Sequence, residues 1–296
     1  MLSAESAGRE RTAAARRGGW VTVALPALAY LGLTLGSAVM VAPFCWMLST
    51  ALKSPAEAFS YPPQWIPRTV TLENFERVWT AVPFGRYTFN SIFVAVSVMA
   101  LELITASMAA YAFARLRFPG RDRLFLLYLA TLMIPGQVTI IPNFILMRYM
   151  DWLDTYQGLI IPNAFTAFGT FLLRQAFLAM PGELEEAAKI DGCGYFGIYR
   201  RIILPLAGPA LATLAILSFQ GSYNAYFWPL VVVSSDEMWT LPLALRLFTG
   251  SAGLYATDWW LVMAGASIAV APMLVIFVLA QKYFVRGIVL TGMGGR

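Results

Sequence analysis

Six stretches of this sequence are long and apolar enough to cross a lipid bilayer, and they limit the possible folds more than any other feature. A transmembrane helix needs roughly 20 mostly apolar residues, because it rises 1.5 Å per residue through about 30 Å of hydrocarbon. Five stretches carry no charged residue and one carries only Glu102; they cover residues 20–52, 87–114, 124–147, 155–173, 202–235 and 259–281. The sequence therefore predicts an all-α, polytopic membrane protein with six transmembrane helices.

The composition supports this class and excludes many enzymes. The chain is 59% hydrophobic and 12% charged, whereas soluble domains are about 45–50% apolar and about 25% charged. It contains no histidine, which removes serine–histidine and cysteine–histidine nucleophile pairs and histidine zinc sites. The two cysteines, Cys45 and Cys193, cannot build a disulfide framework. We therefore expect no catalytic residue and no metal site, and an intramembrane enzyme is disfavoured because no stretch holds His, Asp, Lys or Arg.

The distribution of basic residues predicts the orientation, since Lys and Arg are enriched in cytoplasmic loops. With the N-terminus inside, 15 of the 21 basic residues face the cytoplasm and six face outward. Both termini are then cytoplasmic, and topology rather than nucleic-acid binding explains the net charge of +5. The first apolar run far exceeds a signal-peptide core of 7–15 residues, so we expect a retained helix. The predicted order is a tail at 1–19, a first transmembrane helix at 20–52, an outer loop at 53–86 and a second tail at 283–296.

Two long outer segments, residues 49–86 and 236–258, have room for a partner outside the membrane. The first contains four prolines, which favour extended or turn structure over one long helix. The second contains Trp239, Pro242 and Tyr255 and is too long for a tight turn. Two interpretations stay open: a docking surface for an external protein, or aromatic residues that settle at the level of the lipid headgroups.

The inward-facing segment at 174–205 is polar and strongly patterned. Pro181 suits the first turn of a helix, and Gly192 suits the left-handed residue beyond its end. The acidic residues suited to the positive N-terminal end of that helix are Glu183, Glu185 and Glu186. We predict a helix over about 182–190 and a second amphipathic turn over 195–203, which together form a helix–turn–helix elbow on the inner face.

The predicted helix has one small, apolar face formed by Leu184, Ala187 and Ala188, which fall at i, i+3 and i+4. Without bulky side chains, such a face can sit deep in a groove of another protein, where Glu186 can meet a basic residue. The alternative is a loop helix that packs on its own chain.

The elbow carries a motif with fixed spacing: Glu186-Ala187-Ala188, three residues, Gly192, nine residues, then Ile202-x-Leu204-Pro205. In identity and spacing it resembles the signature of the inner-membrane permeases of binding-protein-dependent ABC importers. Other segments look like the carbohydrate branch of that family, which includes the maltose permeases: residues 109–120, Asn90-Ser91, Asn224, 227–230 and 283–287. The resemblance implies the type I ABC importer permease fold, with a core over 87–282 that contains the coupling loop at 174–205.

By this resemblance, the elbow is the coupling helix that a cytoplasmic ATPase receives in a cleft. Glu186 would pair with an ATPase arginine, the alanines would allow close approach, and Gly192 would make the turn. The residues assigned to this coupling site are Glu186, Ala187, Ala188, Asp191, Gly192, Ile202, Leu204 and Pro205. The other partners implied are a second permease subunit in a heterodimer, two copies of the ATPase, and a solute-binding protein outside a bacterial or archaeal cell membrane.

The chain itself has no P-loop, because that motif needs Gly-Lys-Ser/Thr and the three lysines here follow Leu52, Ala188 and Gln281. ATP and Mg²⁺ are therefore expected on the partner ATPase, and no cofactor is expected in this chain. We expect a transport subunit rather than an enzyme.

A translocation path needs polar or aromatic side chains on otherwise apolar helices, and sugars are bound by aromatic stacking and hydrogen bonds. The residues assigned to this path are Gln220, Tyr223, Asn224, Tyr226 and Trp228. The alternative is that such residues only hold helices together in lipid. Three prolines are expected to mark bent or broken helices: Pro135, Pro142 and Pro162.

Glu102 is the one ionisable residue inside a predicted helix. We interpret it as a structural hydrogen-bonding group or a protonated acid, with a proton relay as the alternative. For the cargo, the resemblance favours a sugar or oligosaccharide, and glycerol 3-phosphate or another polyol is the alternative. An ion-coupled secondary transporter is less favoured, because such proteins commonly carry intramembrane coupling charges.

Overall fold

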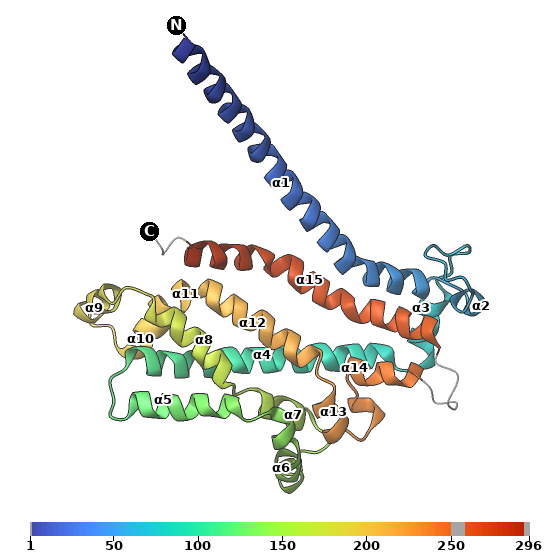
Figure 1. Cartoon of the computed structure of the whole chain (residues 1–296). Helices are drawn as coiled ribbons and strands as arrows, with labels where there is room; N and C mark the ends of the chain where they lie inside the picture. Colours follow the sequence, from blue (N-terminus) through green and yellow to red (C-terminus); the bar gives the residue numbers. More distant parts are fainter. Residues whose placement is uncertain (1, 250–257, 293–296) are drawn as a thin grey trace.

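Figure 1 shows the computed structural model, which describes residues 2–249 and 258–292, with side chains described for 26–249 and 258–279. The described residues form helices joined by turns and short connections, and none of them lies in a strand. The prediction of an all-α fold is confirmed. Two parts of the predicted segments, residues 250–257 of the second outer segment and 293–296 of the C-terminal tail, lie outside the described residues.

Three long helices and a series of short ones make up the described chain. The long helices are α1 (Leu2–Ala51), α4 (Phe84–Arg115) and α15 (Trp259–Gly292). The shorter α-helices are α2 (Pro55–Ala58), α3 (Glu73–Ala81), α5 (Arg121–Ala130), α6 (Gly136–Tyr149), α7 (Tyr156–Ile160), α8 (Ala167–Leu178), α9 (Glu183–Ile190), α10 (Tyr195–Ile198), α11 (Leu204–Leu206), α12 (Gly208–Tyr223), α13 (Phe227–Val232) and α14 (Leu241–Ala244). The 3-10 segments are η1 (Thr131–Met133), η2 (Ile161–Asn163), η4 (Asp236–Met238) and η5 (Leu245–Thr249), and η3 (Tyr199–Ile203) is a π-helix.

Helix α4 lies at the centre of the fold, between α8 and α12 (Figure 1). It takes this place because many of its buried residues recur every three or four positions and so form a continuous stripe. The residues of this stripe include Tyr87, Ser91, Val94, Val98, Glu102, Ala106, Ala110 and Ala114. The three alanines let neighbouring backbones approach closely, and they form a buried cluster with Leu173 and Phe177 of α8.

Three described helical segments are long and apolar enough to cross a membrane: Pro26–Ala51, Phe84–Arg115 and Trp259–Leu279. Two further apolar segments are broken into pairs of helices, Arg121–Met133 with Gly136–Tyr149 and Tyr195–Leu206 with Gly208–Tyr223. The first pair meets at 98° and the second at 79°. Pro135 lies at the first break, as expected for a residue that cannot donate to the helical hydrogen-bond ladder.

The predicted transmembrane helix at 155–173 is not continuous. It is divided into α7, η2 and α8, and Pro162 lies at the division. By length and composition, the described chain therefore offers three spans, or up to five if each bent pair counts as one. The predicted count of six stays a prediction. Pro142, in contrast to the other two prolines, lies inside the continuous helix α6.

Helix α1 contacts α15 near its own C-terminal end and leans away from the remaining helices toward its N-terminus (Figure 1). Its predicted start at residue 20 differs from the structure, where the helix already begins at Leu2. Along Pro26–Ala51 the apolar side chains stay exposed, among them Leu28, Leu33 and Val39. An apolar face of this size needs to be covered by lipid or by another protein.

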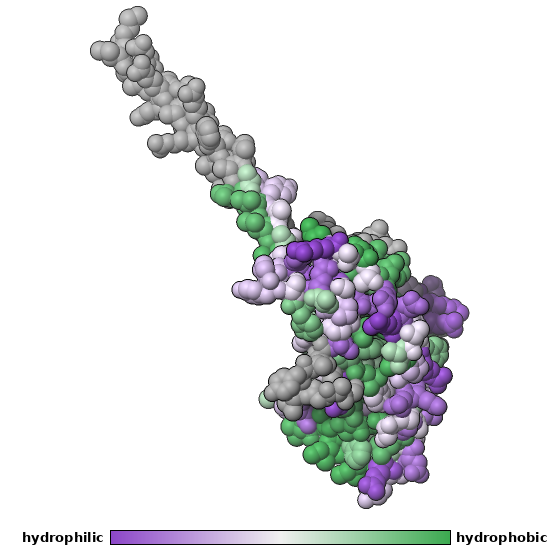
Figure 2. Space-filling view, turned by 90° about the vertical axis from the view of Figure 1, so that its right-hand side faces the viewer, coloured by the Kyte–Doolittle hydropathy of each residue, from purple (hydrophilic) through white to green (hydrophobic). Residues whose placement is uncertain are grey.

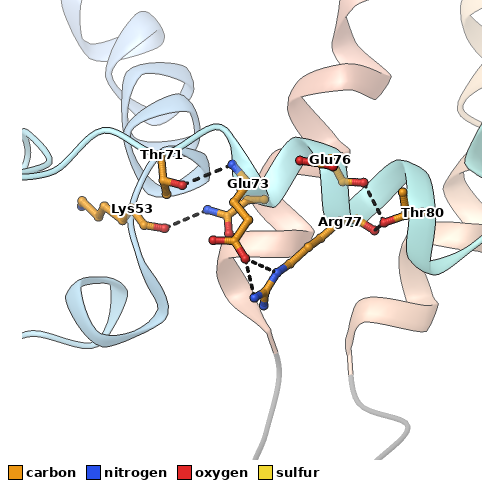
Figure 3. Close-up of polar contacts among 7 residues, drawn as sticks. Lys53, Thr71, Glu73, Glu76, Arg77 and Thr80 are labelled. Carbon is orange, nitrogen blue, oxygen red and sulfur yellow. Dashed lines mark hydrogen bonds and ion pairs between the residues drawn. The ribbon is translucent and has the colours of Figure 1, made fainter.

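The short helices gather at the two ends of the long ones, with α9 and α10 at one end and α2, α3 and α14 at the other (Figure 1). The segment between α1 and α4 holds only short helices, which confirms the effect expected of its prolines. Asn74 of α3 closes the end of α1 by donating hydrogen bonds of 2.8 Å to the carbonyls of Ala51 and Lys53. Figure 3 shows the contact to Lys53 beside the surface ion pair of Arg77 with Glu73, which measures 2.6 Å.

The same end carries a second set of ordered contacts, made by the first turns of α4. The side-chain amide of Asn90 donates to the carbonyls of Glu237 and Trp239, at 2.8 and 2.9 Å. Ser91 accepts a 2.7 Å hydrogen bond from the backbone of Leu241. Figure 2 faces this end and shows hydrophilic surface over much of it, with hydrophobic patches on the coloured part of α1.

Candidate functional site

The predicted elbow is present, and its bounds agree with the sequence to within a residue. Helix α9 covers Glu183–Ile190, and α10 with the π-helix η3 covers 195–203. Gly192 adopts a left-handed φ of +81°, as predicted. The backbone N–H of Gly192 donates to Lys189 at 3.0 Å, and that of Cys193 donates to Ala188 at 2.9 Å. This pair of bonds is a Schellman motif, which satisfies the last carbonyls of α9 and turns the chain sharply.

A buried ion pair holds the elbow against α4. Nε of Arg115, the last residue of α4, lies 3.1 Å from Oε1 of Glu185, and the two side chains are 13% and 7% exposed. These two atoms are not aligned for a hydrogen bond, so the contact is an ion pair only. The guanidinium also donates to the backbone carbonyls of Phe177 and, at 2.7 Å, Met180. Arg115 thus fastens the end of α8 and the start of α9 to the same point.

The second half of the elbow is anchored in the same cluster of buried residues. The hydroxyl groups of Tyr199 and Ser107 lie 2.7 Å apart and form a buried hydrogen bond between η3 and α4. Ile202 and Leu204 are partly buried and pack on this cluster, so these two motif residues hold the elbow to its own chain. Pro205 is exposed in α11, directly before the 79° bend into α12.

The outward surface of the elbow carries the other motif residues. Glu186, Ala187, Asp191 and Gly192 are exposed, whereas Ala188 is buried in the cluster against α4 and α8. The predicted apolar face is therefore divided between two environments. The face that stays accessible is larger and more apolar than predicted, because exposed side chains flank Ala187 on α9 and α10: Leu184, Ile190, Tyr195 and Phe196.

A second candidate site is a cavity of about 370 Å³ between α4, α8 and α12. Its lining residues are Val98, Glu102, Asn163, Thr166, Phe168, Leu214, Leu217, Ser218, Gly221, Ser222 and Ala225. The α12 residues among them recur every three or four positions, so that one stripe of this helix forms a wall. The cavity therefore combines an acidic side chain, hydroxyl groups and apolar surface.

Glu102 is 5% exposed and lies beside the N-terminus of α8. Its carboxylate accepts a hydrogen bond from the hydroxyl of Thr166, and that hydroxyl in turn accepts the N–H of Gly169 at 3.0 Å. Thr166 is thus both the N-cap of α8 and the partner of Glu102. The structural hydrogen bond expected of Glu102 is present.

The residues predicted for the path are not brought together at this cavity. Gln220 and Asn224 are exposed, and Tyr226 is partly exposed with its ring against Phe227. Tyr223 is buried and donates a 2.9 Å hydrogen bond to the carbonyl of Ala269 in α15. Trp228 donates to the carbonyl of Gly158 at 2.9 Å. The bonds of Tyr223 and Trp228 join helices, which is the alternative that the sequence left open for such residues.

Sequence reasoning missed Glu185 at the elbow and Ser218 and Ser222 at the cavity. Glu185 had a weak signal, because Arg115 ends an apolar run and needs a carboxylate if the elbow folds back on it. Ser218, Gly221, Ser222 and Ala225 share one helical face of small residues, which is a readable signal for a wall. No group of three or more His, Cys, Asp or Glu side chains that could hold a metal ion occurs in the described part of the chain.

Comparisons with known proteins agree with this architecture. Residues 102–290 match the family model described as binding-protein-dependent transport system inner membrane component. The arabinooligosaccharides transport system permease protein AraQ of Halalkalibacterium halodurans is 37% identical over 230 residues, which are 77% of this chain and 81% of AraQ. The sn-glycerol-3-phosphate transport system permease protein UgpE of Yersinia enterocolitica is 34% identical over 263 residues, which are 87% of this chain and 93% of UgpE.

Solved structures show the same fold. A chain from the crystal structure of a bacterial ABC transporter involved in the import of the acidic polysaccharide alginate matches with a TM-score of 0.79 and 25% identity, covering 88% of this chain and 96% of that one. A chain from the alginate transporter in complex with its pentasaccharide-bound periplasmic protein matches with a TM-score of 0.63. Taken with the family match over nearly two thirds of its length, these similarities mean that the chain belongs to the family of binding-protein-dependent transport system inner membrane components.

Proposed function

We propose that this chain is the permease subunit of an ATP-driven importer for a sugar or oligosaccharide, in a bacterial or archaeal cell membrane. It crosses the membrane six times with both termini in the cytoplasm, and it pairs with a second, different permease to enclose the path. A solute-binding protein delivers the cargo from outside. Two copies of a separate ATPase bind ATP and Mg²⁺, and this chain carries no cofactor.

The observation that carries this proposal is the geometry of the elbow. The buried ion pair of Arg115 with Glu185 fixes α9 rigidly to α4, while Glu186 and Ala187 stay exposed on the opposite surface. A helix fixed on one side and open on the other can transmit the movement of a bound protein to the central helix. An exposed apolar surface with Ile190 at 87% exposure and Phe196 at 65% suits a protein partner. Glu186 at its edge suits a basic partner residue.

The nearest alternative is an importer of sn-glycerol 3-phosphate, because a permease for that solute is 34% identical to this chain. An ion-coupled secondary transporter is less well supported, since Glu102 is the only acid on the described stripe of α4 and bonds to Thr166. Uptake into proteoliposomes that hold the assembled transporter separates these functions. We expect uptake to require internal ATP, and uptake driven instead by a proton or sodium gradient would contradict the proposal.

The variant Glu186→Arg tests the coupling role of the elbow. We expect it to abolish ATP-driven uptake and to weaken co-purification of the ATPase, because two basic residues would then face each other, while the amount of permease in the membrane stays normal. Glu76→Arg is the matched control, since it makes the same charge change at an exposed position of α3 at the opposite end of the molecule. Full uptake by the Glu186→Arg variant would exclude the coupling assignment.

A further inference from the structure

The cavity between α4, α8 and α12 contains a buried polar group without a partner. Ser218 is 9% exposed, and its hydroxyl oxygen makes no hydrogen bond to any described residue. Leaving a buried hydroxyl group unbonded costs about 1–3 kcal/mol, so native proteins rarely tolerate one without a reason. Ser218 lines the same cavity as Glu102, Ser222 and Asn163. The unbonded hydroxyl group is therefore available to a molecule that enters the cavity.

The electrostatic environment of this cavity is negative. Glu102 lies beside the N-terminus of α8, a 12-residue helix whose positive end favours a carboxylate over a neutral acid. The hydroxyl group of Thr166 donates to Glu102, which also suits the ionised form. None of the residues that line the cavity is basic. An anion inside it would face a carboxylate without any compensating positive charge.

The walls suit a sugar in shape and in chemistry. The volume of about 370 Å³ falls within the range of roughly 300–1,000 Å³ that is typical of small-molecule sites. The ring of Phe168, which is 46% exposed, offers an apolar face against which the C–H groups of a sugar ring can lie. A carboxylate accepts hydrogen bonds from sugar hydroxyl groups, and a serine hydroxyl both donates and accepts.

We propose that this cavity is a cargo subsite for an uncharged, hydroxyl-rich solute and that Glu102 disfavours anionic cargo. Glu102 and Ser218 bind hydroxyl groups of the cargo, and Phe168 covers one face of its ring. This inference rests on the proposed importer function and narrows its substrate class. It groups this chain with a relative named for arabinooligosaccharides and separates it from relatives named for sn-glycerol 3-phosphate and for alginate, which are anions.

Thiol labelling of the assembled transporter tests the charge selectivity of the cavity without requiring ATP. Ser218→Cys is made in a chain whose Cys45 and Cys193 are replaced by serine. The thiol is then treated with 2-hydroxyethyl methanethiosulfonate, which is neutral, or 2-sulfonatoethyl methanethiosulfonate, which is an anion of similar size. Thr80→Cys, at an exposed position of α3, gives the reference ratio of the two rates. Ser222→Cys replaces Ser218→Cys if the latter does not assemble.

We expect the neutral reagent to be favoured at Ser218→Cys by about tenfold over the reference ratio, because a single buried carboxylate supplies repulsion of that order. Adding Glu102→Gln should return the ratio to the reference. An arabino-oligosaccharide should slow the labelling, and sn-glycerol 3-phosphate should not. Equal selectivity at both positions, no labelling by either reagent, selectivity that survives Glu102→Gln, or equal protection by both solutes would each overturn the subsite. ATP-dependent uptake by the unmodified chain is measured in parallel, and its loss would instead contradict the importer function.

Discussion

The elbow and the cavity are built in opposite ways. The elbow is one continuous stretch from α9 to α11, and its turn at Gly192 depends on residues a few positions apart. The cavity takes its walls from three helices, and Glu102 and Ser218 are more than a hundred positions apart in the sequence. The elbow exposes its functional surface to a protein, whereas the cavity encloses buried polar groups, of which Glu102 already has a partner and Ser218 does not.

This contrast explains why one region was predicted and the other was not. Local backbone geometry follows from proline, glycine and charge positions, so the turn can be read directly. A cavity wall depends on which helix faces which, and a single apolar helix with a weak amphipathic pattern does not reveal this. The two regions share one feature: each contains a buried acid on or against α4, Glu185 at the elbow and Glu102 at the cavity.

Breaking the ion pair at the elbow should have the largest effect on stability. Glu185→Ala leaves the buried guanidinium of Arg115 without its carboxylate, and the expected loss is about 3 kcal/mol of unfolding free energy. Thermal unfolding of the purified subunit measures it. The adjacent exposed residue supplies the control, because Glu186→Ala should change stability by less than about 0.5 kcal/mol. Equal losses in the two variants would mean that Glu185 does not fasten the elbow.

Crowding the cavity wall should have the next largest effect. A Cβ at Gly169 would lie 2.9 Å from both Oε1 of Glu102 and Oγ1 of Thr166, and 3.2 Å from Cβ of Ala106. Gly169→Ala should therefore destabilise the protein by about 1–3 kcal/mol. Gly208→Ala is the matched change, since a Cβ there meets no atom within 4 Å. If both variants unfold at the same temperature, α8 and α4 are less closely packed than described.

The turn of the elbow offers a smaller effect that separates backbone geometry from docking. Gly192→Ala places a side chain in the left-handed region at φ +81°, with an expected cost of about 1–2 kcal/mol. Gly194→Ala, two residues later, has an ordinary φ of −74° and open space around the new methyl group. We expect ATPase co-purification to fall for Gly192→Ala only. Normal co-purification by both variants would show that the turn does not position α9.

The smallest effect is expected at Asp154, which belongs to neither region and lies between α6 and α7. Burial raises the pKa of this carboxyl, but the backbone N–H groups of Ser234 and Ser235 both donate to it at 3.0 Å, and its pKa is lowered overall. Because the folded pKa is depressed, this stabilisation is present above about pH 4 and is lost as the pH falls through the folded value. Asp154→Asn should reduce the pH dependence of unfolding in that range by less than about 1 kcal/mol; an unchanged pH profile would argue against this contact.

The sequence by itself determined the class of the protein, because apolar runs of this length are stable only as helices in a bilayer. It also determined the elbow, since Pro181, the acidic residues of the first turn and Gly192 act within two helical turns of one another. The family resemblance at Glu186, Ala187 and Ala188 depended on the same short stretch and was confirmed by the match over residues 102–290.

Only the tertiary structure decided how the apolar runs bend and which polar groups meet. The 98° and 79° bends leave α12 and the end of α8 beside α4, and they turn a predicted straight helix at 155–173 into α7, η2 and α8. Glu185 and Glu186 are neighbours in the sequence, yet one is buried against Arg115 and the other is exposed. Glu102 meets Thr166, and Ser218 faces the same cavity, because helices distant in the chain pack there. Contacts of this kind depend on the summed packing of several helices, and no local pattern encodes that sum.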